Sequence, residues 1–73
     1  MQTLVFNTST KSAKLYEGRA EHSDIVYEFT NIPTVKVLEN FYEIMQIDGT
    51  SSEEKRVPVA RLPIANTNMI IKK

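Results

Sequence analysis

The sequence has no cysteine, no tryptophan, one histidine and only two glycines among its 73 residues. Without cysteine no disulfide can hold the fold together, and the single histidine, His22, cannot build a zinc site by itself. Two glycines do not make a glycine-rich phosphate loop, and no stretch approaches the roughly 18 apolar residues of a membrane span. We therefore expect no metal, no cofactor, no small-molecule substrate and no membrane partner.

The short length limits how stable the chain can be on its own. A chain of this size forms one domain, residues 1–73, and buries only about 60% of the surface that its unfolded form exposes. Such a core seldom supplies more than about 3–5 kcal/mol of net stability. Because disulfides and metals are missing, we expect the chain to gain stability from a protein partner or from homo-oligomerisation.

Charge is balanced overall but uneven along the chain. Nine basic and nine acidic residues give a net charge of +0, so we expect no nucleic-acid partner bound through bulk charge. Residues 17–54 hold all nine acidic residues against two basic ones, whereas residues 55–73 hold five basic residues and no acidic one. Either acidic and basic strands lie side by side and form cross-strand pairs, or a basic tail steers an acidic partner.

The most apolar segment is Thr34–Ile47, which fits two structures. A helix is supported by one apolar stripe at helical spacing, formed by Leu38, Phe41, Tyr42 and Met45. A strand–turn–strand reading places the turn at Glu39-Asn40 and leaves Glu43 on the same face as Phe41 and Met45. The β-branched and aromatic residues of the segment favour the strands.

Other segments also read as short strands. They are Gln2–Phe6, Ser12–Glu17, Ile25–Thr30, Arg56–Leu62 and Met69–Ile71, separated by polar turns. The cleanest alternation is in Ile25–Thr30, which we expect to be half-buried, with Ile25, Tyr27 and Phe29 on one face. The fold class predicted is mainly β, a small antiparallel sandwich or partly open barrel of six or seven short strands. The alternative is α+β, with residues 34–47 helical.

Two prolines constrain the strand after residue 55. Pro58 and Pro63 lie five residues apart, so in a regular strand they would remove donors on opposite sides. The segment is therefore an edge strand, or bulged, or ends near Leu62. We predict an edge strand over Arg56–Leu62 that Pro63 terminates. The polar run Asp48–Glu54 reads as an exposed hairpin tip before it.

Nothing in the sequence points to catalysis, and we expect no enzyme. His22 has Ser23-Asp24 beside it, but neighbours in sequence point apart, whereas triads assemble from distant segments. Glu53-Glu54 beside Lys55-Arg56 is typical of a solvated loop. An aromatic and basic platform for single-stranded DNA would need Tyr16, Tyr27 and Tyr42 together with Lys14 and Arg61.

The opening MQTLVFNTSTKSAKLYEG and the closing RVPVARLPIANTNMIIKK resemble short proteins of tailed phages that infect Gram-positive bacteria, encoded near tail and host-recognition genes. The resemblance covers about half of the chain, at its two ends. It implies a β domain associated with the virion or its assembly, made in the host cytoplasm. It implies no functional residues.

The function predicted is a non-enzymatic protein-interaction module, such as a phage tail-associated or assembly protein that self-associates. The alternatives are a small inhibitor or regulator of a host protein and a weak binder of single-stranded DNA. Two surfaces are candidates for the interface, the edge of Arg56–Leu62 and the strand Met69–Ile71. The interface residues predicted are Arg56, Pro58, Arg61, Met69, Ile70 and Ile71.

Overall fold

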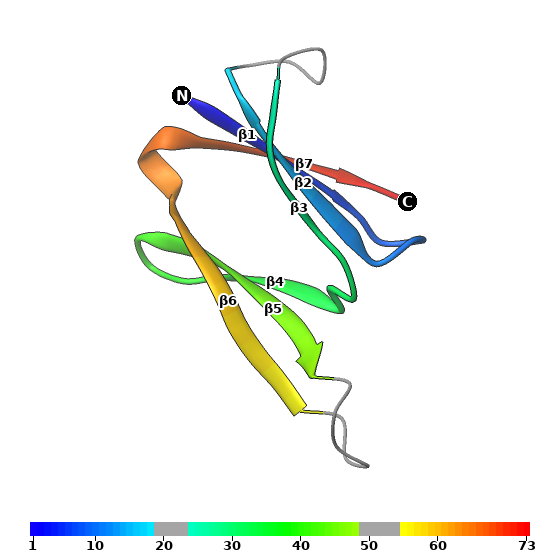
Figure 1. The fold of residues 1–73 in the computed structure, drawn as a ribbon. Helices are drawn as coiled ribbons and strands as arrows, with labels where there is room; N and C mark the ends of the chain where they lie inside the picture. The colour runs from blue at the N-terminus through cyan, green and yellow to red at the C-terminus, as the bar shows by residue number, and fades with distance from the viewer. Residues whose placement is uncertain (19–23, 49–54) are drawn as a thin grey trace.

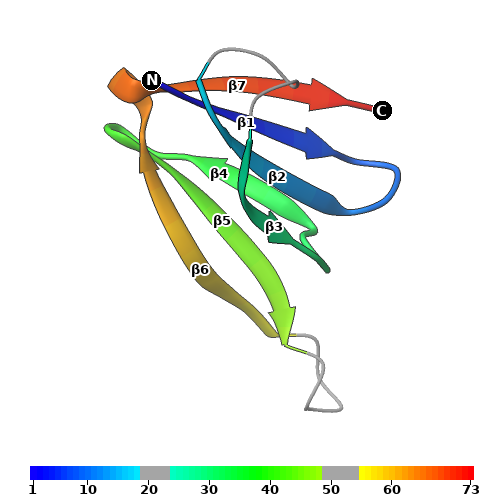
Figure 2. The same ribbon diagram turned by 45° about the horizontal axis from the view of Figure 1, so that its top comes forward.

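The computed structural model describes residues 1–18, 24–48 and 55–73 and contains seven strands in two sheets (Figures 1 and 2). The four-stranded sheet has the order β3-β2-β1-β7, and the three-stranded sheet has the order β4-β5-β6. The strands are β1 (Gln2–Asn7), β2 (Ser12–Glu17), β3 (Ile25–Phe29), β4 (Thr34–Val37), β5 (Phe41–Asp48), β6 (Lys55–Pro63) and β7 (Thr67–Lys72), with a 3₁₀ turn, η1 (Ile64–Asn66), before β7. The predicted mainly β fold is confirmed, as two open sheets of a small sandwich.

β1 and β2, which match the predicted strands Gln2–Phe6 and Ser12–Glu17, form a hairpin. The two strands pair antiparallel from Gln2 opposite Glu17 to Asn7 opposite Ser12. Within the loop, the Asn7 Oδ1 accepts hydrogen bonds from the backbone N–H groups of Ser9 and Thr10, at 3.0 and 3.1 Å. An asparagine side chain that binds the backbone two and three residues later stabilises a tight turn, which fixes the register of the hairpin.

The parallel pairing of β7 with β1 was not expected from the sequence. β7 begins at Thr67, two residues before the predicted strand Met69–Ile71, and it pairs with β1 over all six of its residues. β1 therefore lies between β2 and β7, and its four middle residues are buried. Among them, the Thr3 hydroxyl donates to the Gly18 carbonyl oxygen at 2.6 Å.

The central segment is a hairpin and not a helix. β4 and β5 pair antiparallel, from Thr34 opposite Met45 to Val37 opposite Tyr42. The turn at Glu39-Asn40 is closed by the Leu38 N–H, which donates to the Phe41 carbonyl oxygen at 2.8 Å. No described residue forms an α-helix, so no helix there is long and apolar enough to span a bilayer.

β6 is both an edge strand and a bulged one, which resolves the problem of its two prolines. Ala60 lies opposite Ile44 and Pro58 opposite Met45, so Val59 is an extra residue in the ladder. A bulge shifts the strand's alternation by one residue. The missing N–H groups of Pro58 and Pro63 therefore fall on the same edge of β6, and the other edge keeps all its donors.

The core lies between the two sheets. Its buried members are Leu4, Phe6, Ala13, Leu15, Ile32, Ile44 and Leu62. Ile32 belongs to neither sheet: it sits in the short connection from β3 to β4, yet its side chain is 0% exposed. Its neighbour Asn31 has a positive φ of 56°, and the Ile32 N–H donates to the Lys11 carbonyl oxygen at 2.8 Å. The connection is thus held against the β1–β2 loop with its apolar side chain in the core.

The prediction that β3 is half-buried is wrong. Four of its five residues are exposed, and only Phe29 packs against the core. The register shows why: Ile25 pairs with Tyr16 and Tyr27 with Leu15, so Val26 is a bulged residue that breaks the alternation. As an outer strand of its sheet, β3 also has a neighbour on one side only.

One buried side chain lacks a hydrogen-bond partner within the described part of the chain. The hydroxyl of Thr67, at the start of β7, is enclosed and unpaired. A buried unpaired hydroxyl lowers stability because it loses its water without a replacement.

We expect Thr67→Val to raise the free energy of unfolding by about 1 kcal/mol, because the substitution keeps the shape of the side chain and removes the unpaired hydroxyl. Urea denaturation followed by circular dichroism measures the change. The matched control is Thr3→Val, which removes a hydroxyl that is bonded and should therefore destabilise. A loss of stability in both variants would contradict the prediction.

Candidate functional site

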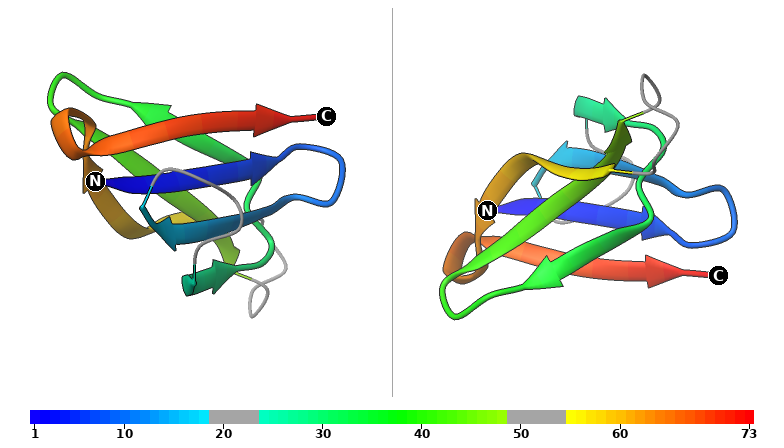
Figure 3. Two further views of the ribbon diagram at one scale, coloured as in Figure 1. Left: turned by 90° about the horizontal axis from the view of Figure 1, so that it is seen from above. Right: turned by 90° about the horizontal axis from the view of Figure 1, so that it is seen from below.

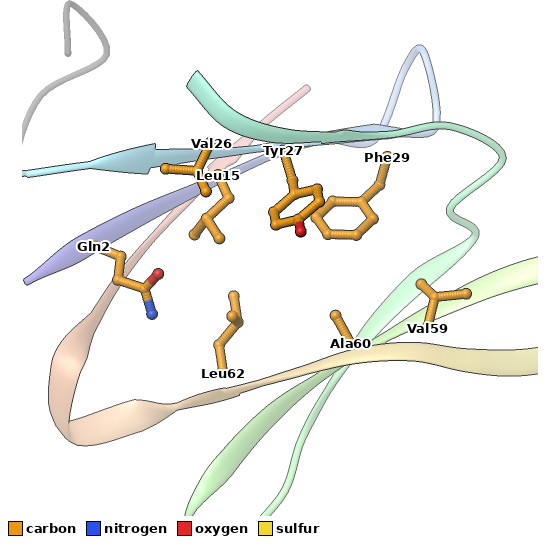
Figure 4. Close-up of a pocket in the computed structure, with 8 residues that line it drawn as sticks. All are labelled: Gln2, Leu15, Val26, Tyr27, Phe29, Val59, Ala60 and Leu62. Atoms are coloured by element: carbon orange, nitrogen blue, oxygen red, sulfur yellow. The ribbon is translucent and has the colours of Figure 1, made fainter. Parts of the chain in front are cut away.

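An open cleft separates β3 from β6, the two edge strands that face each other across one flank of the sandwich (Figure 4). Its volume is ≈ 470 Å³. The four-stranded sheet contributes side chains from one side and β6 contributes them from the other. The lining residues are Gln2, Leu15, Val26, Tyr27, Phe29, Val59, Ala60 and Leu62.

Burial changes from the floor of the cleft to its mouth. Leu15 and Leu62 belong to the core and are 4% and 7% exposed. Tyr27, at the mouth, is 63% exposed, and Val59 is 40% exposed. The cleft is therefore an opening into the hydrophobic core, since the core residues form its floor.

The aromatic rings of the cleft are ordered relative to each other. Tyr27 and Phe29 stack with ring centroids 6.0 Å apart and an interplanar angle of 29°. Phe29 packs against the core, so it anchors the exposed ring of Tyr27. A rigid aromatic side chain with a polar tip is typical of protein interfaces, because it buries much area at little entropic cost.

The side chains that line the cleft are mostly apolar. Among the described residues, those that line it include no carboxylate, histidine, cysteine or lysine. Gln2 supplies the amide group, and Tyr27 the hydroxyl. In the described ranges no three metal-ligating side chains are grouped. An apolar segment with a few polar groups is the ligand class that fits this lining.

The residues predicted for an interface fall on two separate edges. Arg56, Pro58 and Arg61 are exposed on β6, next to the cleft. On β7, Met69 packs against the core, Ile70 is half-buried and Ile71 is 62% exposed. β6 and β7 are edge strands of different sheets, so these six residues are distributed over two edges.

Sequence reasoning missed the contribution of β3 to the cleft. The sequence predicts Ile25, Tyr27 and Phe29 on one face of a half-buried strand, whereas Tyr27 lies with Val26 at the mouth of the cleft. The only signal for this is the adjacent pair Ile25-Val26, where two apolar residues in a row break a strict alternation.

The five residues of the proposed DNA platform lie apart. Tyr16 and Lys14 are on the outer face of the four-stranded sheet, and Tyr42 packs against the core. Tyr27 lies in the cleft, and Arg61 points outward on β6, where it pairs with Glu43. Stacking platforms need aromatic rings exposed side by side on one surface, an arrangement that these three tyrosines lack.

Acidic and basic residues that are far apart in the sequence lie beside each other on neighbouring strands. Glu43 on β5 lies between Lys36 on β4 and Arg61 on β6 in the ladder. The Arg61 Nε donates to Glu43 Oε2 at 2.7 Å, and the Glu43 side chain is 9% exposed. Glu43, which interrupts the apolar outer face of β5, is thus accommodated by a basic partner on the neighbouring strand.

A second, polar depression of ≈ 340 Å³ lies on the outer face of the four-stranded sheet, lined among others by Asn7, Thr10, Ser12 and Lys14. Its hydroxyls and amide are largely engaged with one another or with the loop backbone. Few of its polar groups are therefore left to bind a ligand, and the apolar cleft is the better candidate for a binding site.

Comparison with known proteins gives no match to a family model, to a curated protein or to a solved structure. The site must be interpreted from its own geometry. His22 and residues 49–54, which include Glu53-Glu54 and most of the predicted hairpin tip, lie outside the described residues.

Proposed function

We propose that this chain is a non-enzymatic protein-interaction module, which binds an extended apolar segment of a protein partner in the cleft and also associates with itself. The observation that carries the proposal is the apolar cleft between β3 and β6, which opens into the core and has Tyr27 at its mouth. An isolated domain gains nothing from leaving such side chains in water, whereas a partner that covers them gains their burial.

The shape of the cleft favours an extended segment as its occupant. Both of its walls are edge strands, so an extended chain can lie along the cleft between them. Alternate side chains of such a segment would enter the cleft and meet Leu15, Phe29 and Leu62. This role agrees with the resemblance to phage tail-region proteins, in which a virion-associated or assembly-associated domain works by contact with other proteins.

The proposal is tested with a displayed library of random linear peptides. We expect the wild-type protein to enrich peptides with apolar residues at alternate positions, because alternate residues of an extended chain share one face. Val59→Lys places a charge in the cleft and should abolish the enrichment.

The matched control is Val37→Lys, which adds the same charge at a position outside the cleft that is 70% exposed. This variant should enrich the same peptides as the wild type. Circular dichroism verifies that both variants are folded. Equal enrichment by the wild type and Val59→Lys, or no enrichment by either, would overturn the role of the cleft.

A further inference from the structure

The free edge of β7 differs from the other strand edges of the sandwich. β6 carries two prolines and a bulge, β3 has a bulge at Val26, and β4 is four residues long with Lys36 within it. Prolines, bulges, short strands and lysines are the devices that keep edges from pairing with other chains. β7 has neither proline nor bulge, and it carries no charge before Lys72, its last residue.

The backbone of β7 presents a defined set of groups at this edge. The Thr8 N–H donates to the Lys72 carbonyl oxygen at 2.8 Å, so the backbone polar groups of Lys72 face β1. In a strand, the N–H and C=O of one residue point to the same side, and successive residues alternate. The polar groups of Met69 and Ile71 therefore point away from β1, toward the free edge.

The side chains of β7 leave one apolar group uncovered. Ile71 lies beside Phe6 in the register, and hence on the face of the sheet that carries the core, yet it is 62% exposed. The C-terminal end of β7 projects beyond the three-stranded sheet in both views of Figure 3. Met69, two residues earlier on the same face, does pack against the core.

We propose that β7 pairs antiparallel with β7 of a second copy of this chain, about a twofold axis through Ile70. This register places Met69 opposite the partner's Ile71, and both such pairs exchange two backbone hydrogen bonds, because these are the residues whose polar groups face the edge. The four-stranded sheets of the two copies then form one continuous sheet. The proposal deepens the proposed function, on whose self-association it rests.

Charge and shape favour a second copy as the occupant of this edge. In the proposed register Lys72 lies opposite the partner's Asn68, so no like charges meet, and Ile70 packs against the partner's Ile70. A twofold axis perpendicular to the sheet keeps both three-stranded sheets on the same side. The exposed Ile71 then lies beside the partner's Met69. Met69 packs against the core of its own copy, so Ile71 lies next to a covered part of the partner's sheet. Such an interface is self-complementary, as twofold symmetry requires.

Analytical ultracentrifugation tests the proposal over a range of concentrations. We expect the wild type to sediment as a dimer in reversible equilibrium with the monomer. Ile71→Pro removes a donor that faces the edge and leaves the bonds to β1 in place, so it should give a folded monomer. Ile71→Lys keeps the backbone donor but charges the interface. Each variant should weaken dimerisation by about tenfold or more, because symmetry removes each lost contact twice.

Two controls make the outcomes decisive. Ile71→Val keeps the donor and an apolar β-branched side chain and should remain dimeric, and Val59→Lys in the cleft should dimerise like the wild type. A wild type that stays monomeric at about 100 μM, well above the micromolar affinities of weak specific complexes, would overturn the proposal. So would dimerisation that both Ile71→Pro and Ile71→Lys leave unchanged, or that Val59→Lys abolishes. Peptide binding in the cleft is measured separately, so failure of the β7 dimer leaves that result intact.

Discussion

Ile32→Ala is expected to lower the free energy of unfolding by about 2–5 kcal/mol, which is the range for truncating a large aliphatic side chain in a packed core. Since a domain of this size has about 3–5 kcal/mol in total, the variant should be largely unfolded at 25 °C. Urea denaturation followed by far-UV circular dichroism measures the effect.

The large effect follows from where Ile32 is held. Its side chain is fully buried between the sheets, while its backbone N–H is bonded to Lys11 and the Asn31 carbonyl accepts from the Ile47 N–H at 2.9 Å. These bonds join the connection to the β1–β2 loop on one side and to β5 on the other. The cavity left by truncation therefore cannot collapse easily, and cavities that persist have the larger cost.

Ile25→Ala is the matched control, because it deletes the same atoms from a side chain that is 46% exposed. This substitution should cost less than about 1 kcal/mol, since a side chain that is already half in water loses little burial. Equal destabilisation by the two substitutions would show that Ile32 is not part of the core in solution.

Ala13→Leu is expected to destabilise the fold by about 1–3 kcal/mol through overpacking. Ala13 is 1% exposed and lies between Phe6 and Phe29 in the register of the four-stranded sheet. The two large rings leave room for a methyl group at this position and not for an isobutyl group. Thermal and urea denaturation would both show the loss.

Ala65→Leu makes the same change at an exposed position in η1 and should alter stability by about 0.5 kcal/mol or less. If Ala13→Leu proved as stable as the wild type, Phe6 and Phe29 would not enclose Ala13 as the register indicates. Stabilisation by Ala13→Leu would indicate a cavity at this position.

Local patterns predicted most strands of this fold. The β-branched residues of Thr34–Ile47 decided correctly between hairpin and helix, although the helical spacing of its apolar residues was good. Glu43 was the one residue that contradicted the strand pattern, and the reason lies in a distant segment. Its partner Arg61 is brought beside it by the pairing of β5 with β6, which the pattern within one strand cannot show.

The features that could not be predicted from the sequence all depend on the order of the strands within the two sheets. Ile25–Phe29 alternates like a covered strand, but its place at the outside of a sheet leaves Tyr27 in water. Ile32 lies beside Pro33 in the break after the predicted strand Ile25–Thr30, and only the connection between the two sheets brings its side chain into the core. The cleft could not be predicted for the same reason, since its two walls meet only in the folded chain.

The parallel pairing of β1 with β7 has a consequence for how the chain acquires its structure. β2 can join β1 as soon as the short hairpin between them is made, but β7 is synthesised after every other strand. Contacts between residues so distant in sequence slow folding, because the entropy of the intervening chain must be lost before they form. During translation, β1 therefore remains open along one side until the ribosome has released the segment that closes it, and in that interval it is most vulnerable to aggregation with other nascent chains.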